Sequence, residues 1–328
     1  MHRHIANYVL IALNLVICTN VGFAAPLDFR LLSLIPTGSQ IVSGFENSRR
    51  IRELGGSLFL TTHNNILDLD DMQSILGVDP NRSFREVIEV AFAPPGATPR
   101  EHLLLLNGKF NREAIFRSAI LNGAESIEYL AETVLAIEPF ARERAQMVDT
   151  RWLAILEDRT AVFGTKWMVQ QALNRFEDRA APDAVLLQRL AIFGTDVHSW
   201  SVLASVPAPR TSTSLQLPSP WSVLLKGTEL LMIGISVASK VRLDFFVHAS
   251  DGAAEVDLDH KASQIIRVFG AETPGGDARV PQLRNLRVEE NRVRASVVLT
   301  ENEFVRWRGG EMKRSRELRD LAHLERDE

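Results

Sequence analysis

A continuous apolar run from Leu103 to Leu106 constrains the fold of this chain more than any other stretch. Four apolar residues in succession leave no polar side to face water, so the run predicts a strand covered on both faces. Gly108 allows a tight turn after the strand, and Asn111 can cap a following helix with its side-chain oxygen. Gly123 lies where a left-handed residue closes that helix. The stretch therefore predicts a buried strand, a turn and an amphipathic helix.

Similar patterns recur along both halves of the sequence. Alternating apolar residues predict strands, and apolar residues three or four positions apart predict helices. In each half the predicted order is strand, helix, two strands, helix, two strands, helix. The landmarks are Ile41, Asp68, Phe84, Asn111, Ile127 and Thr165 in the first half, and Trp200, Trp221, Leu230, Asp259, Leu283 and Glu301 in the second.

This repeated order predicts an α+β fold of two similar modules, each an antiparallel sheet with helices packed on one face. We expect a signal peptide over residues 1–24, a first module over 25–178, a second over 179–310, and a charged tail over 311–328 that is a frayed helix or disordered. The two sheets could stand side by side or join edge to edge. The alternative is a single α+β domain whose strands merely recur, since residue identity between the halves is negligible.

The N-terminal residues have the pattern of an export signal. Arg3 supplies a positive charge, Tyr8 to Cys18 forms an apolar core, and small residues end at Ala24. This pattern predicts cleavage after Ala24, because cleavage after Ala25 would leave Pro26 next to the scissile bond. We expect export to the periplasm or beyond, and the alternative is an uncleaved N-terminal anchor.

Cys18 is the only cysteine and lies inside the predicted signal peptide. The mature chain would then have no disulfide, no thiolate nucleophile and no cysteine metal site. The bulky Ile17 also disfavours lipid attachment at Cys18, which needs a small residue before the cysteine. No later stretch has 18 uninterrupted apolar residues, so we expect no membrane span after removal of the signal.

Composition disfavours nucleic acid as a partner. The net charge is −4, with no basic stripe between aromatics and no glycine-rich phosphate loop. Hydrophobic residues make up 45% of the chain, which is enough for sizeable cores. We expect the tryptophans to pack in these cores and not to form a carbohydrate platform. They are Trp152, Trp167, Trp200, Trp221 and Trp307.

Several short motifs resemble those of a group of bacterial proteins. They are Ile41-Val42-Ser43-Gly44-Phe45, the strand and turn from Leu103 to Phe110, the strand with Tyr129, and the turn from Ala161 to Thr165. In these motifs the chain resembles uncharacterised exported proteins of acidobacterial type. The resemblance spans most of the mature chain and implies export and a duplicated α+β module. That family has no assigned activity, so the resemblance implies no catalytic residues.

An acidic group near His63 is the one candidate for a metal site. Asp68, Asp70 and Asp71 could offer oxygen ligands, but the glycine and closing glutamate of a calcium loop are absent at the needed spacing. We interpret Asp68 as a helix cap and its neighbours as favourable charges at the positive end of the helix dipole. The other histidines lack the spacing of zinc hydrolases. The sequence therefore predicts no metal and no cofactor.

Hydrolytic signatures are also missing. Ser43 and Ser126 lack the flanking glycines of a G-x-S-x-G elbow, so we predict no catalytic residue. His248 shares a predicted strand face with Arg242, Asp244 and Phe246. We interpret that face as a solvated sheet surface, with a shallow binding surface as the alternative.

Two functions fit these observations. The first is a non-enzymatic exported envelope protein with a binding or structural role, whose partner or ligand the sequence leaves unknown. An exposed concave apolar surface would support it. The alternative is an exported hydrolase whose acidic residues converge only on folding, which requires two carboxyl groups with separated pKa values in one pocket. We expect the first.

Overall fold

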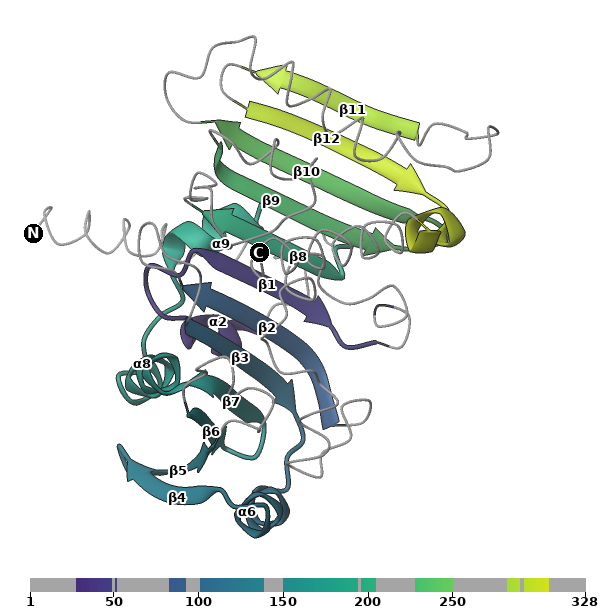
Figure 1. Cartoon of the computed structure of the whole chain (residues 1–328). Coiled ribbons are helices and arrows are strands. Elements are labelled where there is room, and N and C mark those ends of the chain that lie inside the picture. The colour runs from purple at the N-terminus through teal and green to yellow at the C-terminus, as the bar shows by residue number, and fades with distance from the viewer. Residues whose placement is uncertain are drawn as a thin grey trace, which may run out of the picture.

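The computed structural model describes residues 28–48, 51, 83–92, 101–138, 150–193, 196–204, 228–249, 282–289 and 292–306. Twelve strands lie in this part of the chain (Figure 1). They are β1 (Ile41–Glu46), β2 (Phe84–Phe92), β3 (Glu101–Gly108), β4 (Glu125–Tyr129), β5 (Glu132–Ile137), β6 (Arg151–Leu156), β7 (Thr160–Thr165), β8 (Ser199–Ala204), β9 (Thr228–Val237), β10 (Val241–Ala249), β11 (Gln282–Glu289) and β12 (Arg292–Leu299).

All twelve strands belong to one sheet, in the order β11-β12-β10-β9-β8-β1-β2-β3-β7-β6-β5-β4. Every neighbouring pair is antiparallel. The α+β class predicted from the sequence is therefore confirmed. Strands from the two halves of the sequence meet at the β1–β8 pair, so the halves join edge to edge in a continuous ladder.

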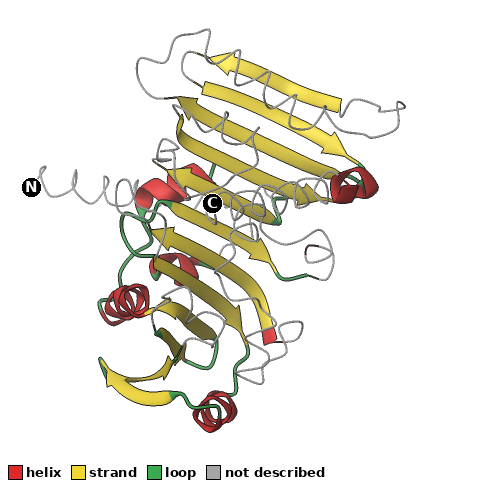
Figure 2. Cartoon of the chain, viewed as in Figure 1, coloured by secondary structure: helices red, strands yellow, loops and turns green. Residues whose placement is uncertain are grey.

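The helices in the described part of the chain are short. They are α2 (Phe29–Ser33), α6 (Arg112–Leu121), α8 (Lys166–Glu177) and α9 (Ala184–Leu190), with a further helical turn over residues 301–306. Figure 2 shows that α2, α6, α8 and α9 lie beside β1–β8, and that among the described residues a helical turn follows the end of β12.

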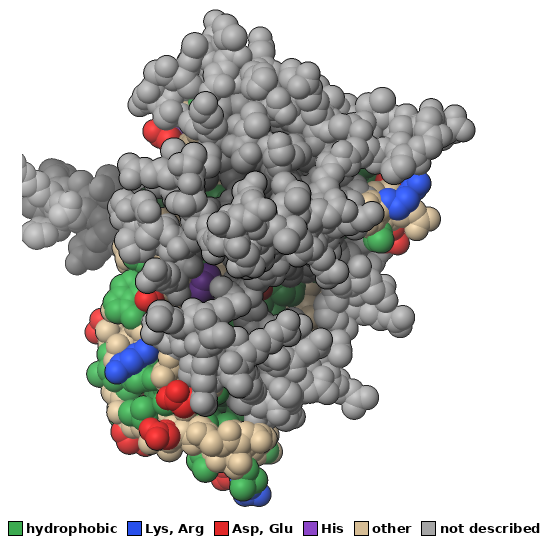
Figure 3. Space-filling model, in the orientation of Figure 1, with side chains coloured by type: hydrophobic (Ala, Val, Ile, Leu, Met, Phe, Trp, Pro, Cys, Tyr) green, Lys and Arg blue, Asp and Glu red, His purple; other side chains and the backbone are tan. Residues whose placement is uncertain are grey.

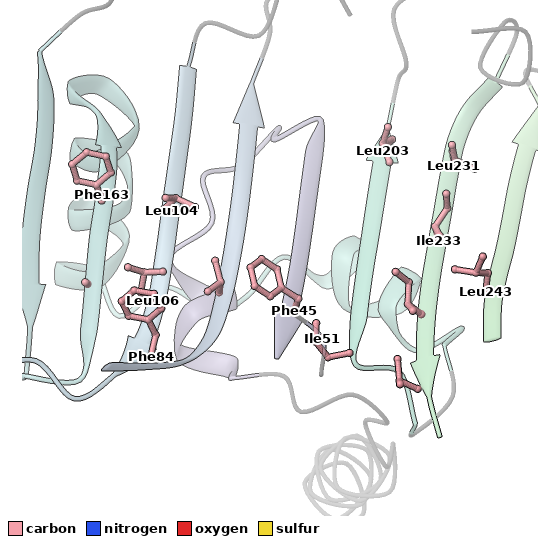
Figure 4. Close-up of a cluster of buried hydrophobic side chains, with 14 of the residues drawn as sticks. Phe45, Ile51, Phe84, Leu104, Leu106, Phe163, Leu203, Leu231, Ile233 and Leu243 are labelled. Atoms are coloured by element: carbon pink, nitrogen blue, oxygen red, sulfur yellow. The ribbon is translucent and has the colours of Figure 1, made fainter. Parts of the chain in front are cut away.

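The expectation of helices on one face is wrong. Ile115 of α6 belongs to the same buried cluster as Leu104, while Met168 of α8 belongs to the cluster of Leu103. Because successive strand residues point to opposite faces, α6 and α8 cover opposite faces of the sheet. We call these the α6 face, part of which Figure 4 shows, and the α8 face. Central strands that are apolar on both sides need cover on both sides.

The strand, turn and helix around β3 follow the sequence closely. The Asn111 side chain accepts a hydrogen bond from the backbone N–H of Ala114 at 3.0 Å, as the cap of α6. Gly123 has φ +94° just beyond the helix. Thr165 stands at the cap position of α8 but makes no side-chain cap bond, because its hydroxyl bonds Glu101 instead. Thr165 is therefore the N-cap residue of α8 by position and not by a side-chain hydrogen bond.

The stretch from Ile127 to Ile137, at the start of which the repeated order places a strand, is not one continuous strand. It forms a hairpin of β4 and β5, turned at Leu130 and Ala131 with φ of 51° and 60°. Two successive residues with positive φ match the mirror-image turn that joins twisted antiparallel strands. The turn contains no glycine or asparagine, so the sequence carried no signal for it.

Several predicted features lie outside the described residues. They are the signal peptide with Ala24 and Ala25, the helices predicted from Asp68, Trp221 and Asp259, and the tail over 311–328. With one cysteine in the sequence, the chain forms no intrachain disulfide. No helix in the described ranges is both long and apolar enough to cross a membrane.

Candidate functional site

The α8 face changes character from one half of the sheet to the other. One cross-strand row shows the change, because each of its residues is the register partner of the next. Its first five members are buried, the sixth is half-buried and the last two are exposed. In order from β3 to β11 they are Leu103, Val90, Val42, Val202, Met232, Phe246, Arg294 and Arg287.

The outer part of this face carries arginines. Arg292 and Arg294 alternate with the buried residues of β12, and Arg287 lies on β11. Phe246 and His248 of β10 lie opposite Arg294 and Arg292. We call Arg287, Arg292, Arg294, Phe246 and His248 together the arginine face.

The central observation on the arginine face is the direct opposition of Arg287 and Arg294. Both side chains are exposed. Neither of them, nor Arg292, forms an ion pair with a residue in the described ranges. Like charges directly opposite on neighbouring strands destabilise a sheet. Among the described side chains, this arrangement therefore places two positive charges together without an acidic ion-pair partner.

Arg242, on the same face, is in contrast fully engaged. Its Nε donates to Asp244 Oδ2 at 2.8 Å and its Nη2 to Asp196 Oδ1 at 2.9 Å. The Ser296 hydroxyl donates to the other oxygen of Asp244 at 2.6 Å. The pKa of Arg242 is raised. Burial of the guanidinium group acts to lower it, but the hydrogen bonds and negative charges of Asp196 and Asp244 have the larger combined effect. Asp244 therefore has little capacity to neutralise the exposed arginines.

His248 has a weaker acidic neighbour. Its Nδ1 lies 3.7 Å from Glu229 Oε2, and the Glu229 side chain is 53% exposed. Arg292 is the register partner of both His248 on one side and Glu289 on the other. The Arg287–Arg294 pair, two residues along, has no acidic register partner. At this point of the arginine face two positive residues, and no acidic one, are therefore directly opposite each other.

The α6 face has a second unusual row. Most of its members are apolar, but three consecutive positions at the middle of the sheet are Glu89, Ser43 and Ser201. The Ser43 hydroxyl donates to the Ser201 hydroxyl at 2.7 Å, and both side chains are buried. Glu89 is 8% exposed, and its Oε2 has no hydrogen-bond partner among the described residues. Burial raises the pKa of Glu89 to about 8.

Glu86 is the other carboxyl group with a raised pKa. Its oxygens accept from the backbone N–H of Asp28, at 3.2 Å for Oε2. Burial raises its pKa to about 8; the Asp28 N–H opposes the rise, and the charges of Asp28 and Glu46 add to it. Asp28 caps α2, which packs on the α8 face, whereas Glu89 faces the α6 side. The two carboxyl groups therefore lie on opposite faces and form no pair.

The other candidates from the sequence are dispersed. His63, Asp68, Asp70, Asp71 and His260 lie outside the described residues. Within the described ranges, no three or more His, Cys, Asp and Glu side chains are placed to hold a metal ion. On the side shown in Figure 3, acidic, basic and hydrophobic side chains of the described part are interspersed. Of the tryptophans, Trp152 and Trp200 are buried as expected, Trp167 is 40% exposed, and Trp221 and Trp307 are outside the described residues.

The sequence analysis grouped Arg242, Phe246 and His248 on one strand face, with a shallow binding surface as the alternative to a solvated surface, but missed the arginines beside them. The strands β11 and β12 were predicted from their apolar positions alone. The signal was present in the alternate positions, where Arg292 and Arg294 flank Val293. Only the register of β11 on β12 places Arg287 against Arg294.

Comparisons with known proteins add little. No protein-family model matches the sequence, and no curated protein does. A solved structure described as "Structure of crystal form I of TP0453" is similar, with a TM-score of 0.49 and 10% sequence identity. The match covers 86% of this chain and 97% of that chain. We draw no functional conclusion from similarity at this level.

Proposed function

We propose that the chain is a non-enzymatic exported binding protein of the bacterial envelope, and that the arginine face binds an anionic partner. The observation that carries the proposal is the exposed Arg287–Arg294 pair. An opposed like-charge pair costs a sheet roughly 0.2–1 kcal/mol, and an anion between the two guanidinium groups reverses the sign of that interaction. The overall charge of −4 makes this local excess of positive charge more distinctive.

Export is supported by the N-terminal sequence. The charged start, the short apolar core and the small residues before Ala24 have the order of a signal peptide. The resemblance to exported bacterial proteins points the same way. We place the mature N-terminus at Ala25, and N-terminal sequencing of the exported protein tests that placement.

We also infer that the sheet arose by duplication of one module. Outward from the central pair, one side runs β1, β2, β3, β7, β6 and the other β8, β9, β10, β12, β11. Each side thus has three strands in chain order, followed by a hairpin. In that hairpin the strand that comes later in the sequence, β7 or β12, is the one nearer the centre of the sheet. The β4–β5 hairpin is extra in the first half. An experimental structure in which the two five-strand sets superpose by a rotation near 180° would support the duplication.

No observation in the described part of the chain favours the hydrolase alternative. That activity would need paired carboxyl groups in one cleft. Glu86 and Glu89 carry the raised pKa values and are separated by the sheet.

The binding proposal is tested on immobilised dextran sulfate with a sodium chloride gradient. We compare the mature chain with R287Q/R294Q and with K109Q/R117Q, which removes two exposed charges from the first half. The wild type and the K109Q/R117Q control should elute at the same salt concentration, and R287Q/R294Q should elute much earlier. Equal elution of all three proteins would refute the arginine face as the binding surface.

A further inference from the structure

We infer that the Arg287–Arg294 pair binds the phosphoryl group of a small organic phosphomonoester, whose organic body lies against Phe246. This inference rests on the proposed function, because it names the ligand class of the same arginine face. It depends on the register of three neighbouring strands, β10, β12 and β11, and on the exposure of the residues involved.

The first step is the match between two arginines and a tetrahedral dianion. Directly opposite residues have Cβ atoms about 4.5–5.5 Å apart, so both guanidinium groups can reach one anion. Each guanidinium is a planar fork that binds phosphate oxygens in pairs. A phosphomonoester carries about −1.5 to −2 charges at pH 7 and three acceptor oxygens, against one charge and two oxygens for a carboxylate. Two opposed arginines therefore favour the phosphomonoester.

The second step concerns the neighbouring charges. Arg292 lies two residues from Arg294 on the same face of β12, about 7 Å away along the strand. It adds positive potential, although Glu289 is its register partner. Asp244 is bonded to Arg242 and Ser296, and Glu229 lies nearest His248. Asp244 and Glu229 are thus directed to other partners, and the register places no acidic residue directly opposite Arg287 or Arg294.

The third step is the direction of the organic body. The row through Arg287 and Arg294 continues to Phe246, which is half-buried, and then to Met232, which is buried. Among the described residues, the apolar contact next to a phosphoryl group on these arginines is the exposed part of the Phe246 ring. This arrangement suits a compact apolar or aromatic body, and phenyl phosphate is the simplest probe.

The test is isothermal titration calorimetry of the mature chain at pH 8 with phenyl phosphate, phenyl sulfate, benzoate and inorganic phosphate. We expect phenyl phosphate to bind at least tenfold more tightly than phenyl sulfate, which has one charge, or benzoate. R287Q/R294Q should weaken phenyl phosphate binding at least 30-fold, and the K109Q/R117Q control less than twofold. F246A should weaken phenyl phosphate binding about fivefold and leave inorganic phosphate unchanged.

The outcomes separate this inference from the proposed function. If R287Q/R294Q loses retention on dextran sulfate but phenyl phosphate binds no better than benzoate, the anionic face stands and the phosphomonoester assignment is overturned. If neither assay responds to R287Q/R294Q, both fail. Tighter binding of a phosphoserine peptide than of phenyl phosphate would overturn the assignment to a small molecule. Circular dichroism of R287Q/R294Q confirms that any loss is not due to misfolding.

Discussion

The indole ring of Trp200 occupies the space that a β-carbon on Gly44 would need. The two residues are register partners across the β1–β8 pair, and an added Cβ on Gly44 would lie 2.4 Å from Cζ2 of Trp200. Glycine is therefore required at this position by a close approach and not by an unusual backbone angle. The contact lies where the two halves of the sequence meet.

Gly44→Ala should destabilise the protein by about 1–3 kcal/mol, the usual cost of overpacking a core, because a ring that is 3% exposed cannot move freely. Urea unfolding monitored by circular dichroism measures the change. Trp200→Leu removes the obstructing ring and also lowers the free energy of unfolding, because a large buried side chain is lost. The double variant should be more stable than the sum of the two changes predicts. Strict additivity would show that Trp200 is not what excludes the methyl group.

Glu89 and Glu86 should make the protein less stable as the pH rises. Both pKa values are raised from 4.5 to about 8, so the folded chain holds protons that the unfolded chain has lost. The contribution of the two protonated carboxyl groups to the free energy of unfolding is fully present below about pH 4.5. It is lost as the pH rises towards 8, by at most about 1.4 kcal/mol per pH unit for each group. Urea unfolding at pH 5, 6, 7 and 8 should show this decline.

Glu89→Gln has no titrating carboxyl group and should flatten the decline by about half. Glu86→Gln keeps an acceptor for the Asp28 N–H and should flatten it by a similar amount. A pH dependence unchanged in Glu89→Gln would mean that this carboxyl group is ionised in the folded protein.

Ser43 and Ser201 should behave as a coupled pair. Each single alanine variant leaves one buried hydroxyl without its partner, which costs about 1–3 kcal/mol. The double variant S43A/S201A removes both hydroxyl groups and should cost less than the two single changes together. Thermal unfolding of the four proteins gives the coupling. Zero coupling would contradict the hydrogen bond between the two hydroxyl groups.

The β4–β5 turn should accept a better turn sequence. Leu130 and Ala131 both have positive φ, and Leu130 is 42% exposed, so little core contact is lost on its replacement. Leu130→Asn with Ala131→Gly gives the sequence that this turn type favours. The double variant should be more stable by about 1–2 kcal/mol in urea unfolding. Destabilisation would mean that Leu130 contributes packing that its exposure conceals.

Local features with a direct chemical cause were predictable from the sequence. The β3 run and the Asn111 cap depend on residues within a few positions of each other. The β4–β5 hairpin was missed because its turn is imposed on Leu130 and Ala131 by the pairing of the flanking strands. Helices on both faces were also missed, although the unbroken run of Leu103 to Leu106 already required cover on both sides.

The candidate site was only partly predictable. The alternation in β10 placed His248, Phe246 and Arg242 on one face. The opposition of Arg287 to Arg294 depends on a register shift between Arg284 and Arg287, next to Asn285 with φ 55°. A shift of one residue would place Arg287 on the other face of the sheet. Composition could not reveal such a pair in a chain that is acidic overall.

The central β1–β8 pair has a consequence for how the chain is made. Ser43 and its partner Ser201 are 158 residues apart, so β1 emerges long before the strand that completes it. At ribosomal speeds of 5–20 residues per second, that delay is about 10–30 s. Throughout this time one side of β1 presents unsatisfied backbone groups to any other nascent chain. The interval during which a chaperone is most needed is therefore determined by the position of β8 in the sequence.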